Sequence, residues 1–152
     1  MSAFSKVGVD LIYKGYSCIP ILPGEKRPGR FINGNWVGMS GWQKYCSQLP
    51  TRFEFEHWDN NWPDAGVCVC LGQSSSIIAI DLDYGSDSVR EAIESILPKS
   101  PVKKRGAKGY TAFYKYSGEK PKKWFINGQS VCELLSQGNQ TVLPPTLHPD
   151  GM

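Results

Sequence analysis

The sequence segment IIAIDLD carries two aspartates, Asp81 and Asp83, at the end of an apolar run. Side chains two residues apart in a strand point to the same face, so the two carboxylates project together while Leu82 faces the other way. Neighbouring carboxylates repel each other unless a cation lies between them, and Mg²⁺ or Mn²⁺ is a hard cation that suits such a pair. The alternative interpretation is that the strand leaves the core here and its acids cap the following loop.

A third acid, Glu133, interrupts the apolar segment SVCELLS. Strand alternation places Glu133 on one face with Val131 and Leu135, and Cys132 and Leu134 on the other. An acid within such a run is costly to bury unless it is paired or bound to a metal, so we interpret Glu133 as a third carboxylate of the same site. The alternative is a glutamate on an edge strand that reaches water.

The segment KSPVKKRGAKGY contains several cations and no acid. One interpretation is a phosphate-facing patch, for a polynucleotide or a nucleoside triphosphate. The alternative, which the charge run alone favours, is a solvated loop. The cations are Lys99, Lys103, Lys104, Arg105 and Lys108.

These residues need a scaffold that combines many strands with a few helices. Apolar periodicity predicts a helix over 5–15, a second helix opened by a capping box of Thr51 and Glu54, and a third helix within 86–98. Two Asn-Gly pairs between apolar residues predict hairpins. We therefore expect the α+β class, with a mixed or antiparallel central sheet and flanking helices. The predicted strands and hairpins cover 16–22, 31–37, 66–72, 76–83, 110–116, 124–135 and 140–146.

The composition is that of an ordinary globular protein. The chain has 152 residues, 40% of them hydrophobic and 20% charged, with a formal net charge of +3, which fits one domain with a substantial core. No apolar run is long enough for a membrane span, and the N-terminus lacks the pattern of a secretory signal. Five cysteines without a CxxC pair predict free thiols in a reducing cytoplasm. A zinc site is the weaker alternative, because His57 and His148 do not fall at a zinc-finger spacing.

Seven motifs occur along the chain in the order GYSCIPILPGEKRPG, SGW, GVCVCLG, IIAIDLD, GYTAFYKY, SVCELLS and TVLPPTLHPDG. Their order and spacing resemble the bifunctional DNA primase/polymerase (prim-pol) domain of the archaeo-eukaryotic primase superfamily. The last motif is similar to the family's Pro-Pro-Ser-x-His-Pro signature. The resemblance covers nearly the whole chain, and it implies a primase-polymerase architecture with an RRM-like core and a nucleotidyl transferase activity.

The resemblance implies that Asp81, Asp83 and Glu133 are the catalytic acids and hold two divalent ions, Mg²⁺ or Mn²⁺. These ions would clamp the attacking 3′-oxygen and the triphosphate of the incoming nucleotide. The family usually has aspartate at the third position, and Glu133 is one methylene longer. In the family's second motif a histidine faces the nucleotide, whereas this chain has Thr111, which supplies no imidazole. We therefore expect impaired catalysis unless nearby cations compensate.

The resemblance also implies contacts with the nucleotide or with DNA. Lys26, in the segment GEKRPG, matches the family's Lys-x-Pro loop, and a solvated turn is the alternative. Lys108, Arg105 and Lys115 are the cations that would compensate for the missing histidine. His148, in the final motif, is a candidate phosphate or sugar contact, and an ordinary surface histidine is the alternative.

Three functions are open at this point. The leading hypothesis is template-directed primer synthesis and extension, with a single-stranded DNA template, a primer and nucleotide triphosphates as partners. The second is a non-catalytic module that binds single-stranded DNA or a nucleotide for a larger replication protein, and the third and weakest is a metal-dependent nuclease. The length predicts that residues 1–152 form a single domain. The ending at HPDGM predicts that this domain is an N-terminal piece of a longer replication protein, with a helicase domain as a further partner.

Overall fold

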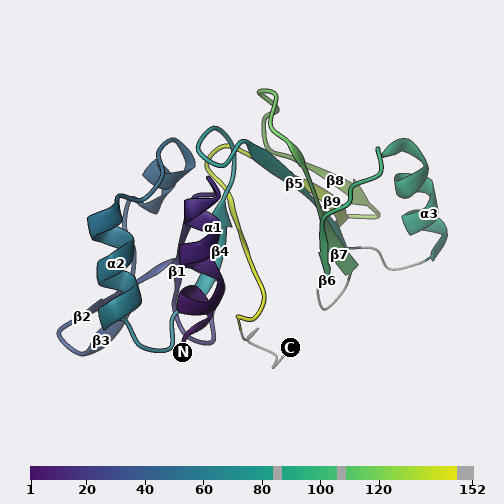
Figure 1. Ribbon diagram of the computed structural model, residues 1–152. Helices are drawn as coiled ribbons and strands as arrows, with labels where there is room; N and C mark the ends of the chain where they lie inside the picture. Colours follow the sequence, from purple (N-terminus) through teal and green to yellow (C-terminus); the bar gives the residue numbers. More distant parts are fainter. Residues whose placement is uncertain (84–86, 106–108, 147–152) are drawn as a thin grey trace.

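The strands of the computed structural model, which describes residues 1–83, 87–105 and 109–146, form three antiparallel sheets (Figure 1). The first sheet has the order β1-β4-β10, the second is the hairpin β2-β3, and the third has the order β6-β7-β5-β9-β8. The α+β class is confirmed, and the strands are divided among separate sheets instead of forming one central sheet. The bounds are β1 Cys18–Ile21, β2 Gly29–Ile32, β3 Asn35–Gly38, β4 Gly66–Cys70, β5 Ile77–Asp83, β6 Lys103–Arg105, β7 Gly109–Lys115, β8 Lys122–Ile126, β9 Gln129–Leu135 and β10 Gln140–Val142.

Local sequence signals account for the helices. The N-terminal π-helical turn η1 continues directly into α1, and Gly15 follows with a φ of +98°, a left-handed conformation that glycine adopts without strain. The predicted capping box begins α2: the amide of Glu54 donates to Thr51 Oγ1 at 3.2 Å, and the amide of Thr51 donates to Glu54 Oε1 at 2.9 Å. The bounds are η1 Phe4–Gly8, α1 Val9–Tyr13, the 3₁₀ helix η2 Trp42–Cys46, α2 Arg52–Asn61 and α3 Asp87–Ile96.

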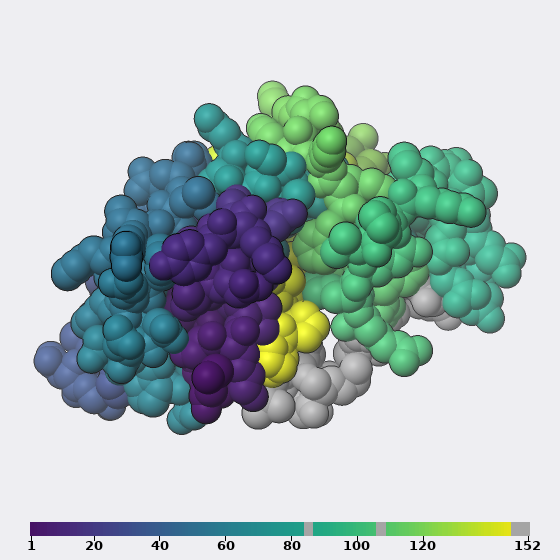
Figure 2. All heavy atoms as spheres, viewed as in Figure 1, coloured from purple at the N-terminus to yellow at the C-terminus, as the bar shows by residue number. Residues whose placement is uncertain are grey.

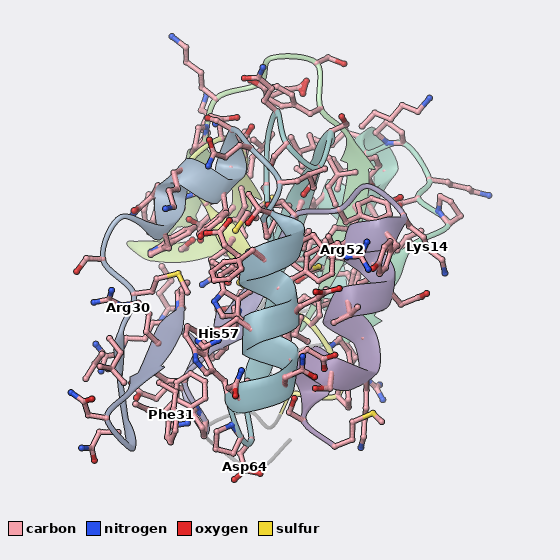
Figure 3. All side chains as sticks on the ribbon, turned by 60° about the vertical axis from the view of Figure 1, so that its left-hand side comes forward. Lys14, Arg30, Phe31, Arg52, His57 and Asp64 are labelled. Atoms are coloured by element: carbon pink, nitrogen blue, oxygen red, sulfur yellow. The ribbon has the colours of Figure 1, made fainter. Side chains whose placement is uncertain are left out.

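Aromatic rings connect the β2-β3 hairpin to the main core. Phe31 lies 5.6 Å from Trp36, Trp36 lies 5.8 Å from Trp62, and Trp62 lies 5.7 Å from Trp58 of α2, all between ring centroids. Figure 3 views this side of the molecule, with Phe31 on the hairpin and His57 on α2. Contacts of this kind add to the hydrophobic gain of burying the rings, so the hairpin is held against α2.

Both predicted Asn-Gly turns are confirmed. Asn33 and Gly34 have φ values of 51° and 78°, and they connect β2 to β3. Asn127 and Gly128 have φ values of 50° and 79°, and they connect β8 to β9. Positive φ at both central residues matches the twist of a two-residue hairpin, which explains why Asn-Gly predicts it well.

Two connections join the first sheet to the third: 71–76 leads from β4 to β5, and 136–139 leads from β9 to β10. The amide of Leu71 donates to the carbonyl of Asn139 at 2.9 Å, so the connections are hydrogen-bonded to each other. The buried hydroxyl of Ser75 donates to the carbonyl of residue 70 at 2.6 Å. Buried polar groups with satisfied partners are rigid, and they hold the two sheets in a defined relative position.

The two faces of the third sheet have different neighbours. Ile80 and Leu82 belong to one apolar cluster, against which Val89 and Ile93 of α3 pack. On the opposite face, Ala79 belongs to the main core of the N-terminal half. The predicted helix within 86–98 is therefore confirmed as α3, and β5 is a rigid mount with apolar packing on both sides.

A β-bulge changes one expected orientation in the third sheet. The register between β8 and β9 shifts between Trp124 and Phe125, where β9 has one residue more than its partner. A bulge interrupts strict alternation, and Val131 packs in the same apolar cluster as its neighbour Cys132. Val131 therefore does not share a face with Glu133, which corrects the prediction from simple alternation.

All five cysteines are free and buried, as expected. Burial raises the pKa of Cys18 to about 12, so this thiol is a weak nucleophile at neutral pH. Among the described helices, none is both long enough and apolar enough to cross a membrane.

Candidate active site

Five residues form one row across the third sheet. Lys104 of β6 lies opposite Thr111 of β7, Thr111 lies opposite Asp81 of β5, and Asp81 lies opposite Glu133 of β9. Glu133 in turn lies opposite Lys123 of β8. Directly opposed residues of an antiparallel pair point to the same face, so the whole row, here called the charged row, projects on one side of the sheet.

The centre of the charged row holds two opposed carboxylates. Opposed residues have Cα atoms roughly 4.5–5.5 Å apart in an antiparallel pair, so the side chains of Asp81 and Glu133 are close neighbours. The hydroxyl of Thr111 donates to Asp81 Oδ1 at 3.1 Å, and Lys123 Nζ lies 3.9 Å from Glu133 Oε2. Each carboxylate thus has a partner on its outer side and faces the other carboxylate on its inner side.

Asp83 lies two residues beyond Asp81, at the end of β5. Strand alternation puts it on the face of the charged row, and it pairs with Gly109, which has no side chain to cover it. Its side chain is exposed, whereas Asp81 and Glu133 are half-buried. The three predicted acids therefore share one face, with Asp83 at the open end of the strand.

Lys104 is the residue of β6 that lies on the face of the acids, next to Thr111, and sequence reasoning did not select it as a site residue. Its side chain is half-buried. Burial lowers the pKa of Lys104, the carboxylate of Asp81 opposes that effect, and the charge of Lys26 adds to it. Lys104 therefore lies within electrostatic range of both residues. The signal was present in the sequence only as the alternation within KKR, which has meaning once β6 is known to be a strand.

The basic segment is not a single loop, because 103–105 form the edge strand β6. This corrects the interpretation of the run as one solvated loop or one patch. Arg105 lies opposite Tyr110, on the face that α3 covers, so the structure does not bring it to the carboxylates. Lys103 lies on that face too, with Nζ 5.0 Å from the centroid of the Tyr110 ring. Lys115 pairs with Ile77 at the far end of β7, six positions from Asp83 along β5.

Three further residues were predicted to contact the nucleotide or DNA: Lys26, Lys108 and His148. Lys26 is exposed, and its carbonyl accepts a hydrogen bond from Gln140 Nε2 at 2.8 Å, which links its loop to β10. Lys108 and His148 lie outside the described residues. The side chain of Thr146, just before that end, anchors the Pro-rich segment to β4, because Thr146 Oγ1 accepts from the amide of Val67 at 2.9 Å. Figure 2 shows the atoms of this last described segment, in yellow, at the surface between the N-terminal helices and the green strands.

The acids fit a divalent cation by the type of atom they offer. No three His, Cys, Asp or Glu side chains within 1–83, 87–105 and 109–146 are grouped closely enough to hold a metal ion together. Asp81 and Glu133 nevertheless supply carboxylate oxygens from directly opposed positions, and hard cations prefer such ligands. Like charges placed directly opposite each other destabilise a sheet, and a bound cation would remove that cost.

The third sheet thus presents two opposed carboxylates between two lysines on one face. The family model for the bifunctional DNA primase/polymerase, N-terminal domain, matches residues 9–152. The chain belongs to this family, as the motifs predicted, and the family is one of DNA primases and polymerases that act on DNA and nucleotides. Domains of this class typically use divalent metals. No curated protein matches the chain.

Proposed function

We propose that this chain catalyses template-directed nucleotidyl transfer, in which the 3′-hydroxyl of a primer attacks the α-phosphorus of a nucleotide triphosphate and pyrophosphate leaves. The observation that carries the proposal is the charged row, in which opposed Asp81 and Glu133 lie between Lys104 and Lys123. Family membership supports the reaction class, and the row supports the location of the site.

In this proposal Asp81, Asp83 and Glu133 hold Mg²⁺ or Mn²⁺. Bound divalent ions neutralise charge on the triphosphate and stabilise the attacking and leaving oxygens. The rigid mount of β5 fixes the direction of the two aspartates, and the hydroxyl of Thr111 orients the carboxylate of Asp81.

Among the described residues, Lys104 is the principal contact for the phosphates in this proposal. It has a cationic group on the same face as the acids and lies opposite Thr111. The motif resemblance matches Thr111 to the family's histidine. A half-buried ammonium interacts more strongly with phosphate than an exposed one, because the surrounding protein screens the charge less than water does. Lys26, which affects Lys104 electrostatically, is a second contact from the opposite loop.

A non-catalytic binding module is the second candidate, and one observation favours it. Thr111 uses its hydroxyl on Asp81 and offers no imidazole, so the group that faces the nucleotide in this family is missing. The same site would still bind a nucleotide or single-stranded DNA through its lysines. Hydrolysis of a phosphodiester by the same acids is the third and weakest candidate.

The test is incorporation of a labelled nucleotide into a primed single-stranded template, with Mg²⁺ or Mn²⁺. We expect lengthened primers with the unmodified chain, and a loss of at least about a hundredfold in Asp81→Asn and in Glu133→Gln, because electrostatic stabilisation is the main catalytic term. Glu91→Gln is the matched control, since Glu91 is an exposed acid on α3. Binding without lengthening would support the binding module, and shortened DNA would support the nuclease.

A further inference from the structure

The strand β8 is an exposed edge of the third sheet. It is the last strand in the order β6-β7-β5-β9-β8, and each of its residues is exposed. Its sequence KKWFI combines two lysines with three large apolar side chains. Trp124, Phe125 and Ile126 are 41%, 59% and 45% exposed. Large apolar side chains gathered at one exposed edge are unusual for a solvated strand, and they mark a binding surface.

The two faces of β8 each carry a lysine and an aromatic ring. Lys123 lies on the face of the charged row, where it approaches Glu133, and alternation puts Phe125 on the same face, since the extra residue of the bulge belongs to β9. Lys122 and Trp124 lie on the opposite face, with Lys122 Nζ 5.3 Å from the centroid of the Trp124 ring. Phe125 is thus an exposed ring on the same face as the proposed catalytic acids, two residues from the end of the charged row.

The edge formed by β8 and the residues before it carries a net positive charge. The segment 119–126 reads EKPKKWFI, with Lys120, Lys122 and Lys123 against the single acid Glu119. Glu119 is occupied in part, because its carboxylate accepts from the amide of Ser117 at 2.7 Å. The ion pair of Lys123 with Glu133 is long, at 3.9 Å, and Lys123 remains 55% exposed, so it retains most of its attraction for an external anion.

We propose that β8 binds single-stranded DNA and guides the template strand across the sheet edge to the charged row. Phosphates would contact Lys122 and Lys123, and bases would stack on Phe125 and Trp124, since cations interleaved with exposed rings are the means by which proteins hold single strands. The inference rests on the proposed function for the role of the strand as template, and it adds the surface that binds it.

The same edge could also add a strand from a second copy of this chain, and its sequence argues against that. Lysines on an edge strand hinder pairing with another strand, and β8 carries two of them in five residues. A polyanion with planar bases satisfies the lysines and the rings together.

The test is fluorescence anisotropy of a labelled oligothymidylate of about 12 nucleotides, a length within the range of single-strand sites. We expect Phe125→Ala to weaken binding by about fivefold or more, and Phe125→Trp to retain binding, because one stacked base contributes that much. Phe125→Leu should bind as weakly as Phe125→Ala, since it keeps an apolar side chain but loses the planar face. The matched control is Phe53→Ala, because Phe53 is an 83% exposed ring on α2.

The lysines are tested by the salt dependence of the same titration. Each of Lys122→Gln and Lys123→Gln should reduce the slope of log affinity against log salt concentration by about 0.7, the value for one phosphate contact on a single strand. Lys14→Gln, just after α1, is the control and should leave the slope unchanged. Equal affinity of the chain and Phe125→Ala would overturn the inference, as would dimers in solution that Phe125→Ala converts to monomers.

Failure of this inference and failure of the proposed function give different results. If the chain lengthens primers while all β8 variants bind DNA normally, the inference is wrong and the proposed function stands. If no nucleotide is incorporated but Phe125→Ala and the lysine variants weaken DNA binding as expected, the surface stands and the catalytic proposal is wrong.

Discussion

Replacement of Asp81 by asparagine separates two effects of the opposed carboxylates: their mutual repulsion in the metal-free protein and their binding of a divalent cation. The side-chain amide oxygen that Asp81→Asn introduces would still accept the hydrogen bond of Thr111, so the buried hydroxyl keeps its partner. The change removes the repulsion from Glu133 and also the attraction to Lys104. The repulsion is worth about 0.2–1 kcal/mol for a directly opposed pair, and the attraction to Lys104, which lies one strand further away, is smaller and of opposite sign. The free energy of unfolding in a chelator should therefore change by no more than about 1 kcal/mol.

The response to manganese should differ far more. A cation at a hundred times its Kd stabilises the folded state by about 2.7 kcal/mol, which for a chain of this size raises Tm by roughly 5–10 °C. Asp81→Asn removes one of the two opposed carboxylates, so we expect most of that rise to be lost. The Tm of Asp81→Asn should therefore be close to that of the unmodified chain without manganese, and clearly lower than it when manganese is added.

The assay is thermal unfolding followed by circular dichroism, in EDTA and then in a series of manganese concentrations at constant ionic strength. Glu91→Gln controls for general effects of lost charge, and it should shift as the unmodified chain does. An equal rise of Tm in Asp81→Asn and the unmodified chain would refute the assignment of Asp81 as a ligand. A chain whose Tm does not respond to manganese at all would refute the metal site.

Two further predictions concern the neighbours of Asp81. Burial lowers the pKa of Lys104, so its charge costs stability at neutral pH, and the free energy of unfolding should rise as an alkaline pH passes from the folded to the unfolded pKa. Lys104→Met should therefore raise Tm at neutral pH, remove that alkaline rise and weaken nucleotide triphosphate binding; a lower Tm would contradict the reasoning. Thr111→Val keeps the shape but removes the donor to Asp81 Oδ1, and should cost about 1 kcal/mol in urea unfolding. Unchanged stability and incorporation in Thr111→Val would mean that the hydroxyl has no role.

The local features of this protein follow from its sequence because their physical causes are local. Strand alternation is enough to put Asp81 and Asp83 on one face. The capping box of Thr51 and the Asn-Gly hairpins depend on residues within three or four positions of one another, and all are present in the structure. The resemblance of the sequence motifs to the primase/polymerase family also identified the family correctly.

The register across the third sheet was decided only by the tertiary structure. Which residue lies opposite Asp81 depends on how far β7 and β9 slide along β5. Apolar residues of all three strands pack in one cluster with α3, and this packing restricts which faces the strands can present. A slip of one residue would move Glu133 to the other face. Such a choice involves residues about 50 positions apart in the chain, and no local signal encodes it.

The basic segment 99–108 is a second case in which strand pairing, and not the sequence, assigns side chains to a face of the sheet. As a sequence, 99–108 is a run of like charges, and nothing in its composition separates one lysine from the next. Once β6 pairs with β7, alternation sends Lys104 to the acids, and Lys103 and Arg105 to the face of α3. The sequence alone put Asp81 and Asp83 on one face and indicated Glu133 as the third acid. The tertiary structure decided which cation of β6 lies on their face, because only strand pairing assigns each side chain to a face of the sheet.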